Sequence, residues 1–488
     1  MRHTVWLAMV AALTGCARTP PEVRLIHEAA DAVGGRPAIE SVKTIVLEGD
    51  GANFNLGQNR SPAADLPEFK VTGFRRAIDV AGGRWRQEQT RTPTFPAGNP
   101  APQKQVAGLD GDVAFNVAAD GTVTRASERI ARDRRAELMH HPVGILRAAM
   151  AEGTRLGNLR QYGNHDVVDV TPAQGGTFTL SIDSATKLPA RVVSMISNTN
   201  LGDVAMETEF GGYKDAGGGL KLPTELTTRL DKYTTAKLTL SASRVNGDTG
   251  DLSAPAAATS APAASAPTVT VEALAAGVWL LAGQSHHSVV IEFSDHLTLI
   301  EAPQDDARTL AVIAKARELV PGKPLTKVVN THHHFDHSGG VRAAVSEGLT
   351  LVTHEGNKTF YEDMMARAHT IEPDHLAKNP KPLRLQPVAG RLEMKDASMT
   401  VEIYPVTGSL HCDTMLMAYL PKQRLLVEVD LYAPPAPNAA VAPAFPFAPN
   451  LLQNIQDLKL KVDRVVPLHG RIAPFRDLVA AATGTAGR

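Results

Sequence analysis

Cysteine is scarce in this chain, and neither sign of charge is in excess. Only two cysteines occur in 488 residues, too few for a disulfide framework, so burial or metal must hold the fold together. Lys and Arg total 50 against 51 Asp and Glu, which gives a formal net charge of −1. Because basic surfaces bind the phosphates of nucleic acids, this balance predicts that nucleic acid is not a partner.

Long hydrophobic runs are also missing. The apolar run from Val5 to Leu13 is much shorter than the ~20 residues that span a bilayer. It follows Arg2 and precedes small residues, which is typical of a secretory signal. No other stretch is long and apolar enough to be a transmembrane helix.

The end of this segment, Leu13-Thr14-Gly15-Cys16, resembles the bacterial lipobox, in which the cysteine is lipidated after cleavage. The resemblance implies a lipoprotein-type signal peptide over residues 1–16. It also implies a mature chain anchored to a membrane through a lipid on Cys16, on the periplasmic side of the bacterial cell envelope. An ordinary signal peptide with a coincidental cysteine is the alternative.

Residues 251–268 are rich in Pro, Ala and Ser and contain almost no large apolar side chain. This composition predicts an extended, semi-rigid spacer. It divides the chain into a domain over residues 22–250 and a domain over residues 269–488, within the two to four domains that the length suggests.

The first domain is predicted to be a largely antiparallel sheet with helices, an α+β arrangement. Helices are expected over residues 22–40 and Arg125–Met150, with His140 and His141 in structural roles beside Pro142. Turn residues separate short alternating runs, which indicates antiparallel strands. The order of elements loosely resembles the curved-sheet periplasmic domains of lipoprotein-sorting proteins. No catalytic constellation is found here, and any protein partner of this domain is unknown. The expected strands are Lys43–Glu48, Thr177–Ile182, Ala190–Ile196, Val204–Phe210 and Lys237–Ser243.

The second domain mixes strands with helices and is predicted to be α/β, with helices covering sheet faces. Helices are expected at Asp306–Leu319 and Val341–Ser346. The expected strands are Val289–Phe293, Leu297–Ile300, Lys327–Thr331, Leu349–Thr353, Thr400–Val406, Thr414–Leu420, Leu425–Asp430 and Arg464–Leu468.

Histidine is concentrated in this second domain, where 12 of the 17 histidines lie after residue 285. A predicted strand runs directly into His332-His333-His334-Phe335-Asp336-His337. In extended backbone, side chains two residues apart share a face, so His332 and His334 can reach one ion. Asp336 and His337 follow as the chain turns and can point to a second position. Imidazole and carboxylate suit zinc, and also iron or manganese.

The pattern His332-x-His334-x-Asp336-His337 resembles the signature of the metallo-β-lactamase superfamily, over about residues 270–480. The resemblance implies an αββα sandwich with a site at one edge of its sheets. It also implies two metal ions, with Asp430 between them. The implied ligands are His332, His334 and His411 for the first ion, and Asp336, His337 and His469 for the second.

The chemistry expected of this domain is hydrolysis. Two metal ions can share a water, lower its pKa and deliver hydroxide to a carbonyl or phosphoryl centre. Asp336 and Asp430 are the candidate catalytic carboxylates, and no Gly-x-Ser-x-Gly nucleophile elbow occurs. We therefore expect an exported, dinuclear zinc-dependent hydrolase that attacks an ester, lactone, thioester or amide of a small molecule. In the family, Asp430 stands where true β-lactamases use Cys or Ser, which favours the thioesterase, lactonase and phosphodiesterase branch.

Two other functions stay open. One is an iron-dependent sulfur dioxygenase with a single metal, and the other is an envelope lipoprotein that binds a ligand and has lost catalysis. Several other side chains have alternatives of their own. His286 and His287 line the pocket or lie on the surface, and His354, His369 and His375 bracket a possible helical lid and contact substrate or do not. His333 should point away from the ions, and Cys412 is a packed thiol or a redox-sensitive one. Glu301 stands where the family commonly has Asp, which we interpret as a tolerated change behind the ligands.

Overall fold

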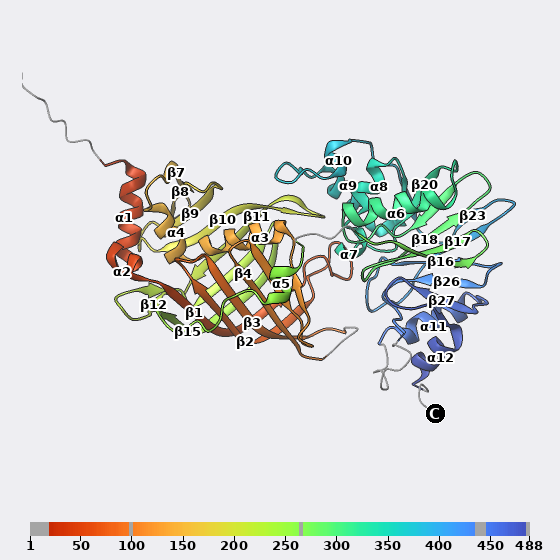
Figure 1. The fold of residues 1–488 in the computed structure, drawn as a ribbon, viewed down its shortest axis with the longest axis horizontal. Helices are drawn as coiled ribbons and strands as arrows, with labels where there is room; N and C mark the ends of the chain where they lie inside the picture. The colour runs from red at the N-terminus through yellow and green to blue at the C-terminus, as the bar shows by residue number, and fades with distance from the viewer. Residues whose placement is uncertain (1–18, 97–100, 263–266, 435–445, 485–488) are drawn as a thin grey trace, which may run out of the picture.

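The computed structural model describes residues 19–96, 101–262, 267–434 and 446–484. Figure 1 shows two domains side by side, the first coloured red to green and the second green to blue. The predicted signal segment 1–16, with Cys16, lies outside the described residues. Within the described ranges, no helix is both long and apolar enough to cross a membrane.

The amino-terminal domain is built on one 13-stranded sheet in the order β6-β5-β4-β3-β2-β1-β15-β14-β11-β10-β9-β8-β7. Neighbouring strands are antiparallel, as in the pairs β1–β15 and β10–β11, so the predicted antiparallel-sheet domain is confirmed. The strands are β1 (Thr44–Phe54), β2 (Glu68–Asp79), β3 (Arg84–Pro93), β4 (Gln103–Asp110), β5 (Val113–Val117), β6 (Val123–Arg125), β7 (Arg155–Tyr162), β8 (His165–Thr171), β9 (Phe178–Asp183), β10 (Pro189–Asn198), β11 (Gly202–Gly211), β14 (Glu225–Leu230) and β15 (Tyr233–Val245), with β12 (Lys214–Asp215) and β13 (Lys221–Leu222) as a separate pair.

Helices cover one face of this sheet. Along β11, buried and partly exposed residues alternate strictly, as expected for a strand with one face against a core. Leu25 and Ile145 from two of the helices pack with Val168 and Leu180 from the strands in one apolar cluster. The helices are α1 (Pro21–Val33), α2 (Arg36–Ser41), α3 (Glu128–Ala136), the 3-10 turn η1 (Glu137–Met139) and α4 (Pro142–Ala149).

The single helix predicted over Arg125–Met150 is wrong: the segment holds α3, η1 and α4. The backbone at His141 is extended (φ −145°, ψ 140°), because the ring of the following Pro142 disfavours a helical conformation before it. The His141 ring instead caps α4, its Nδ1 accepting from the backbone N–H of Val143 at 3.2 Å. The break therefore follows from proline chemistry.

The predicted extended spacer also needs correction. Part of it forms the short helix α5 (Ala256–Ser260), which lies against β5 and β6. Leu252 and Ala258 are buried there. Alanine is the best helix former and leaves a small side chain that can pack closely, so this half of the segment docks on the first domain.

The carboxyl-terminal domain contains two sheets. The first is a 7-stranded sheet in the order β16 to β22, antiparallel up to β19 and parallel from β19 to β22. The second is a 6-stranded sheet in the order β23 to β28, in which only β26 and β27 are parallel. The strands are β16 (Thr270–Ala275), β17 (Val278–Ala282), β18 (Ser288–Glu292), β19 (Leu297–Ile300), β20 (Leu325–Val329), β21 (Thr350–His354), β22 (Leu385–Val388), β23 (Leu392–Lys395), β24 (Thr400–Pro405), β25 (Leu416–Leu420), β26 (Leu425–Glu428), β27 (Arg464–Pro467) and β28 (Ala473–Pro474).

Three apolar clusters show how these sheets are layered. One joins the facing sides of the two sheets, as in Ile291 and Val427. A second joins the outer face of the first sheet to helices, and a third does so for the second sheet. The domain is therefore an αββα sandwich, as predicted, which explains why its central strands are apolar on both faces. Its helices are α6 (Asp306–Leu319), α7 (Phe335–Ser338), α8 (Val341–Ser346), α9 (Lys358–Ala366), α10 (His375–Lys378), α11 (Ala448–Asp457) and α12 (Phe475–Thr483), with the 3-10 turn η2 (Glu355–Asn357).

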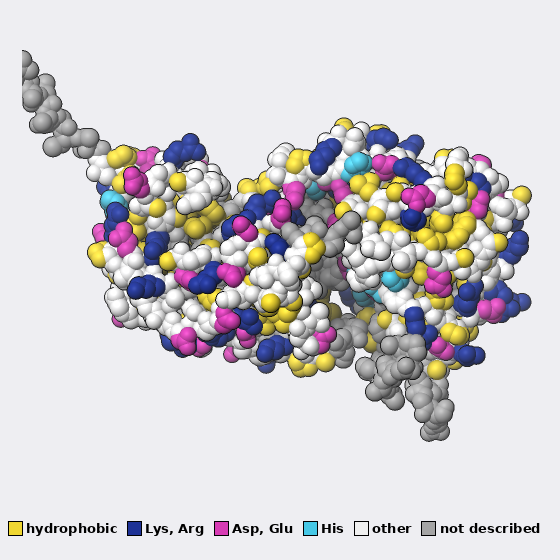
Figure 2. Space-filling model, in the orientation of Figure 1, with side chains coloured by type: hydrophobic (Ala, Val, Ile, Leu, Met, Phe, Trp, Pro, Cys, Tyr) yellow, Lys and Arg dark blue, Asp and Glu magenta, His cyan; other side chains and the backbone are white. Residues whose placement is uncertain are grey.

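The two domains are joined by polar contacts as well as by the chain. Asp231 pairs with Arg367 at 3.0 Å, and the Asn200 amide donates to Ser338 Oγ at 2.7 Å. Figure 2 shows a notch between the domains and an even mixture of basic and acidic side chains over this face.

The buried His140 predicts a pH-dependent stability for the first domain. Its ring lies between Thr208 Oγ1 (3.0 Å) and Ser194 Oγ (2.9 Å), and burial lowers its pKa to about 3. The unfolded chain binds a proton below about pH 6.5 and the folded chain does not. Stability is therefore full above pH 6.5 and falls between about pH 6.5 and pH 3, by up to about 1.4 kcal/mol per pH unit for this group.

Urea unfolding at several pH values, followed by the fluorescence of the buried Trp85 in a Trp279→Phe chain starting at residue 19, measures this slope. His140→Gln should reduce it by the share of this group, because glutamine can fill both hydrogen bonds without titrating. The neighbouring His141, whose pKa burial also lowers to about 3, keeps its own share. An unchanged slope in that variant would contradict the assignment.

Candidate metal centre

The residues of the histidine motif and the later candidate ligands all lie beyond strand ends. His332 and His334 lie in the loop after β20, and Asp336 and His337 lie in the short helix α7. His411 lies between β24 and β25, Asp430 follows β26, and His469 follows β27. Because the ends of neighbouring strands meet at one edge of a sheet, loops from both sheets converge there. All seven sequence-predicted ligands are brought together at this edge.

Four of them form a first group. One ligand atom from each of His332, His334, His411 and Asp430 lies within 4.8 Å of the others. Three ring nitrogens of this group, His332 Nε2, His334 Nδ1 and His411 Nε2, are buried and make no hydrogen bond of ordinary geometry among the described residues. Asp430 Oδ2 lies 3.3 Å from the first of them and 3.1 Å from the third. Buried polar atoms are normally satisfied. Three such atoms that converge beside a carboxylate fit a metal cation.

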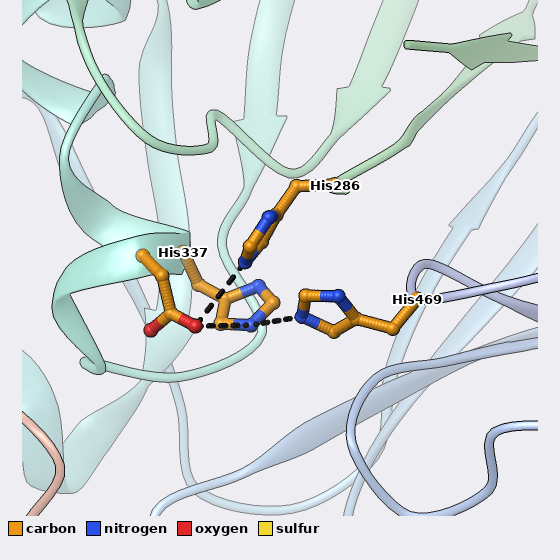
Figure 3. A group of neighbouring side chains, drawn as sticks. His286, His337 and His469 are labelled. Carbon is orange, nitrogen blue, oxygen red and sulfur yellow. Dashed lines mark hydrogen bonds and ion pairs between the residues drawn. The ribbon is translucent and has the colours of Figure 1, made fainter. Parts of the chain in front are cut away.

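A second group consists of Asp336, His337, His469 and one further residue, His286. Figure 3 shows the rings of His286, His337 and His469 pointing toward one another from two loops and the helix α7. The sequence left the role of His286 open. Its backbone carbonyl accepts from the fully buried Arg308 at 3.1 Å, and its Nε2 lies 3.2 Å from Asp336 Oδ2.

The second group brings two ring nitrogens into direct opposition. His337 Nε2 and His469 Nε2 are 3.0 Å apart. Each ring has its other nitrogen beside an acceptor: His337 Nδ1 lies 2.9 Å from Glu301 Oε2, and His469 Nδ1 lies 2.9 Å from the Ser285 carbonyl. Rings that donate from Nδ1 present lone pairs at Nε2. Two facing lone pairs need a proton or a metal cation between them.

Asp430 connects the two groups. Its Oδ2 lies 3.1 Å from both His411 Nε2 and His337 Nε2, and its Oδ1 lies 3.2 Å from His469 Nε2. A carboxylate with contacts on both sides can share its charge between two ions. The position between the groups is the one that the family resemblance implies for this residue.

The pKa values show where this site favours positive charge. Burial lowers the pKa of His332 to about 3 and that of His469 to about 4, so both rings are neutral near pH 7. Burial also lowers the pKa of His337, but Asp430 and Asp336 outweigh it and raise that pKa well above its ordinary value. Burial raises the pKa of Asp336, yet the charge of His337 and the hydrogen bond from His286 lower it overall. A cation is therefore favoured between Asp336, His337 and Asp430.

Glu301 contacts the ring nitrogen of His337 that faces away from the other candidate ligands. It is fully buried, and its carboxylate accepts from the Thr331 backbone N–H at 2.6 Å and from His337 Nδ1 at 2.9 Å. Such carboxylate-to-histidine contacts fix the ring and its tautomer at metal sites. Glu301 has φ 71° and Asp430 has φ 60°, a left-handed conformation that is uncommon for residues other than glycine.

The other histidines and the cysteine lie apart from the two groups. His333 Nδ1 lies 3.3 Å from Thr414 Oγ1 and 3.7 Å from Cys412 Sγ. Burial raises the pKa of the Cys412 thiol to about 11, which makes it unreactive. His369 contacts the carboxylate of Asp374, and His375 contacts that of Glu347.

Comparison with known proteins agrees with this architecture. Residues 282–426 match the sequence model of the metallo-beta-lactamase superfamily. This region of the chain belongs to that superfamily. As a metallo-beta-lactamase-fold domain it is a metallo-hydrolase, with the two His/Asp groups as its candidate metal sites.

Solved structures similar to the chain include metallo-beta-lactamases of three bacteria. The enzyme from Pontibacter korlensis is 20% identical over 45% of this chain and 100% of its own, with a TM-score of 0.33. The one from Hirschia baltica is 18% identical over 44% and 96%, with a TM-score of 0.33. FIM-1 from Pseudomonas aeruginosa, in a mono-zinc form, is 20% identical over 44% and 93%, with a TM-score of 0.32.

The contacts of Glu301 predict that two substitutions at this position affect zinc affinity and fold stability differently. Glu301→Gln keeps an oxygen for the Thr331 N–H but turns an amide toward His337 Nδ1, so the ring proton is displaced to Nε2. Zinc affinity should fall about 10- to 100-fold. Glu301→Ala leaves two buried donors unpaired and should also destabilise the fold by about 1–3 kcal/mol for each donor.

Zinc titration and thermal unfolding of the two variants measure these effects. Glu292→Gln, which alters a remote ion pair with Lys323, is the matched control. Wild-type zinc affinity in Glu301→Gln would show that Glu301 does not hold the His337 tautomer.

Proposed function

We propose that this chain is an exported, dinuclear zinc-dependent hydrolase of a small-molecule ester, lactone, thioester or amide. In this proposal His332, His334 and His411 hold one ion, Asp336, His337 and His469 hold the second, and Asp430 lies between them. His286 is an additional candidate ligand of the second ion. The convergence of buried ring nitrogens on the carboxylate of Asp430 carries the proposal.

The ligand set suits zinc. It consists of imidazole and carboxylate groups without thiolate, since the buried Cys412 lies beside His333 instead. Zinc accepts nitrogen and oxygen ligands in such sites, and iron or manganese would also fit the donor types. Zinc held there would polarise a substrate oxygen and lower the pKa of a water molecule toward neutral pH.

Two carboxylates of the protein, Asp336 and Asp430, would have separate roles in the reaction. Asp336 keeps a negative charge, and 39% of its side chain is exposed. It is therefore suited to accept a hydrogen bond from an attacking water and orient it toward the substrate. Asp430, with 16% of its side chain exposed, supplies negative charge between the histidines. Neither role needs a side-chain nucleophile.

The proposal predicts two zinc ions per chain and hydrolysis that depends on them. His334→Ala removes a ring with a buried, unpartnered nitrogen and should reduce hydrolysis by more than about 100-fold, the upper end of what loss of an outer partner costs. His27→Ala, on the exposed side of α1, is the control. Metal quantification on the full chain, with lactone, thioester, phosphodiester and β-lactam substrates, tests both statements.

Two results would contradict the proposed function. One is hydrolysis that survives His334→Ala. The other is a single iron per chain with oxygen uptake on a persulfide, which would favour the dioxygenase alternative.

The proposed export predicts a lipid-anchored protein. Cys16→Ala removes the only acceptor thiol of the lipobox-like segment, so the protein should move from the membrane fraction to the soluble envelope fraction. Cell fractionation and labelling with a radioactive fatty acid measure the change. Cys412→Ala, which removes a buried thiol, is the matched control. A Cys16→Ala protein that stays in the membrane fraction without label would contradict lipid anchoring through this residue.

A further inference from the structure

The loop between β1 and β2, residues 55–67, belongs to the amino-terminal sheet but reaches the candidate metal centre. Three consecutive loop residues contact three consecutive residues of the histidine motif. The Gly57 carbonyl accepts from the Phe335 backbone N–H at 3.1 Å. The Gln58 amide donates to Asp336 Oδ1 at 2.7 Å. The Asn59 carbonyl lies 3.0 Å from His334 Nε2.

The far side of this loop is tied to the segment that carries His411. The Arg60 guanidinium donates to the Ser409 carbonyl at 2.8 Å and pairs with Asp413 at 2.5 Å. The Asp413 backbone N–H in turn donates to the Arg60 carbonyl at 2.7 Å. The loop thus contacts two of the three chain segments that supply the first group.

The Asn59 contact fixes the chemistry of a candidate ligand. A backbone carbonyl can only accept, so His334 must carry its proton on Nε2. The lone pair is then on Nδ1, the buried atom without a hydrogen-bond partner. The Asn59 side chain holds this carbonyl in place by donating to the carbonyls of Pro62 and Ala64 at 3.3 and 3.1 Å.

The Gln58 contact acts on the second group. Its amide occupies Oδ1 of Asp336 and leaves Oδ2 facing His286 and His337, at 3.2 and 3.6 Å from their Nε2 atoms. One neutral donor from the other domain therefore decides which carboxylate oxygen faces the candidate ligands.

We propose that the amino-terminal domain completes the metal centre, with Gln58 and Asn59 as positioning residues that set the metal affinity. This inference rests on the proposed function, because it assigns the two groups to metal. Asn59 positions His334 in the first group, and Gln58 positions Asp336 in the second. Neither residue is a metal ligand.

Gly57 offers a way to move the loop without touching a ligand. Its φ is +74°, and a Cβ at this position would clash with the Phe335 ring. Gly57→Val should therefore push the loop away and break the Asn59 contact to His334. Gln58→Ala is a milder change, a truncation of a partly exposed side chain, and keeps the test valid if Gly57→Val does not fold.

The experiment is zinc titration of the full chain against a competing chromophoric chelator. In Gln58→Ala, the affinity of one zinc site should fall about 10- to 100-fold while the other is unchanged. In Gly57→Val, the affinities of both sites should fall. Asp231→Asn, which breaks the interdomain pair with Arg367 away from the ligands, should leave both unchanged.

A second readout does not need metal. Nitrogen-15 NMR of the metal-free chain should show His334 as the Nε2-protonated tautomer, and Gly57→Val should shift it toward a mixture. This separates positioning from a general loss of stability.

The outcomes are distinct. Wild-type affinities in Gln58→Ala and Gly57→Val, or an equal loss in Asp231→Asn, would overturn the positioning role and leave the proposed function intact. A wild-type chain that binds no zinc would overturn both.

Discussion

The candidate metal centre depends on three imidazole rings, each of which has a hydrogen-bond acceptor at the nitrogen that faces away from the other candidate ligands. Glu301 lies beside His337 Nδ1, the Ser285 carbonyl beside His469 Nδ1, and the Asn59 carbonyl beside His334 Nε2. Each acceptor forces the opposite ring nitrogen to present a lone pair to the shared space. Lone pairs gathered in a buried region without a cation are unfavourable. The sheets, the loops and the docking of the two domains all serve to place these acceptors, which come from three separate parts of the fold.

Two residues of the site have a strained backbone conformation, and the carboxylates of both contact His337. Glu301 and Asp430 each come just after a central strand, β19 or β26, and both have positive φ. Such conformations cost on the order of 1–3 kcal/mol each and persist only where the surroundings enforce them. Here the enforcing surroundings are strands buried between two sheets. The sharp turn places one carboxylate beneath His337 and the other between the two groups.

Much of the second domain could be predicted from the sequence, because its signals are local. Strand runs apolar on both faces indicate a covered sheet, and the spacing of His332, His334 and Asp336 indicates ligands at one strand end. His411, Asp430 and His469 needed the family resemblance. His286 was left open because the family resemblance brings its hairpin near the metals without assigning a ligand there. Gln58 and Asn59 could not be found, since their contacts cross 278 and 275 residues and involve an ordinary amide and a backbone carbonyl. The helix break before Pro142 was also missed, although its signal is local. The amphipathic pattern continues through this position, but the proline ring ends the helix there.

The pairing of β1 with β15 has a consequence for the order in which the molecule is assembled. The central part of the first sheet cannot close until residues 233–245 are available, whereas the loop that follows β1 is already flanked by the β1–β2 pair. Contacts between distant segments form late because closing long loops costs entropy. In a chain made from its amino terminus onward, His469 follows β26 and β27 and can meet its partners only when most of the second sheet has been made. Metal uptake would then come late and would cross-link separate segments of the second domain, as disulfides do in cysteine-rich proteins.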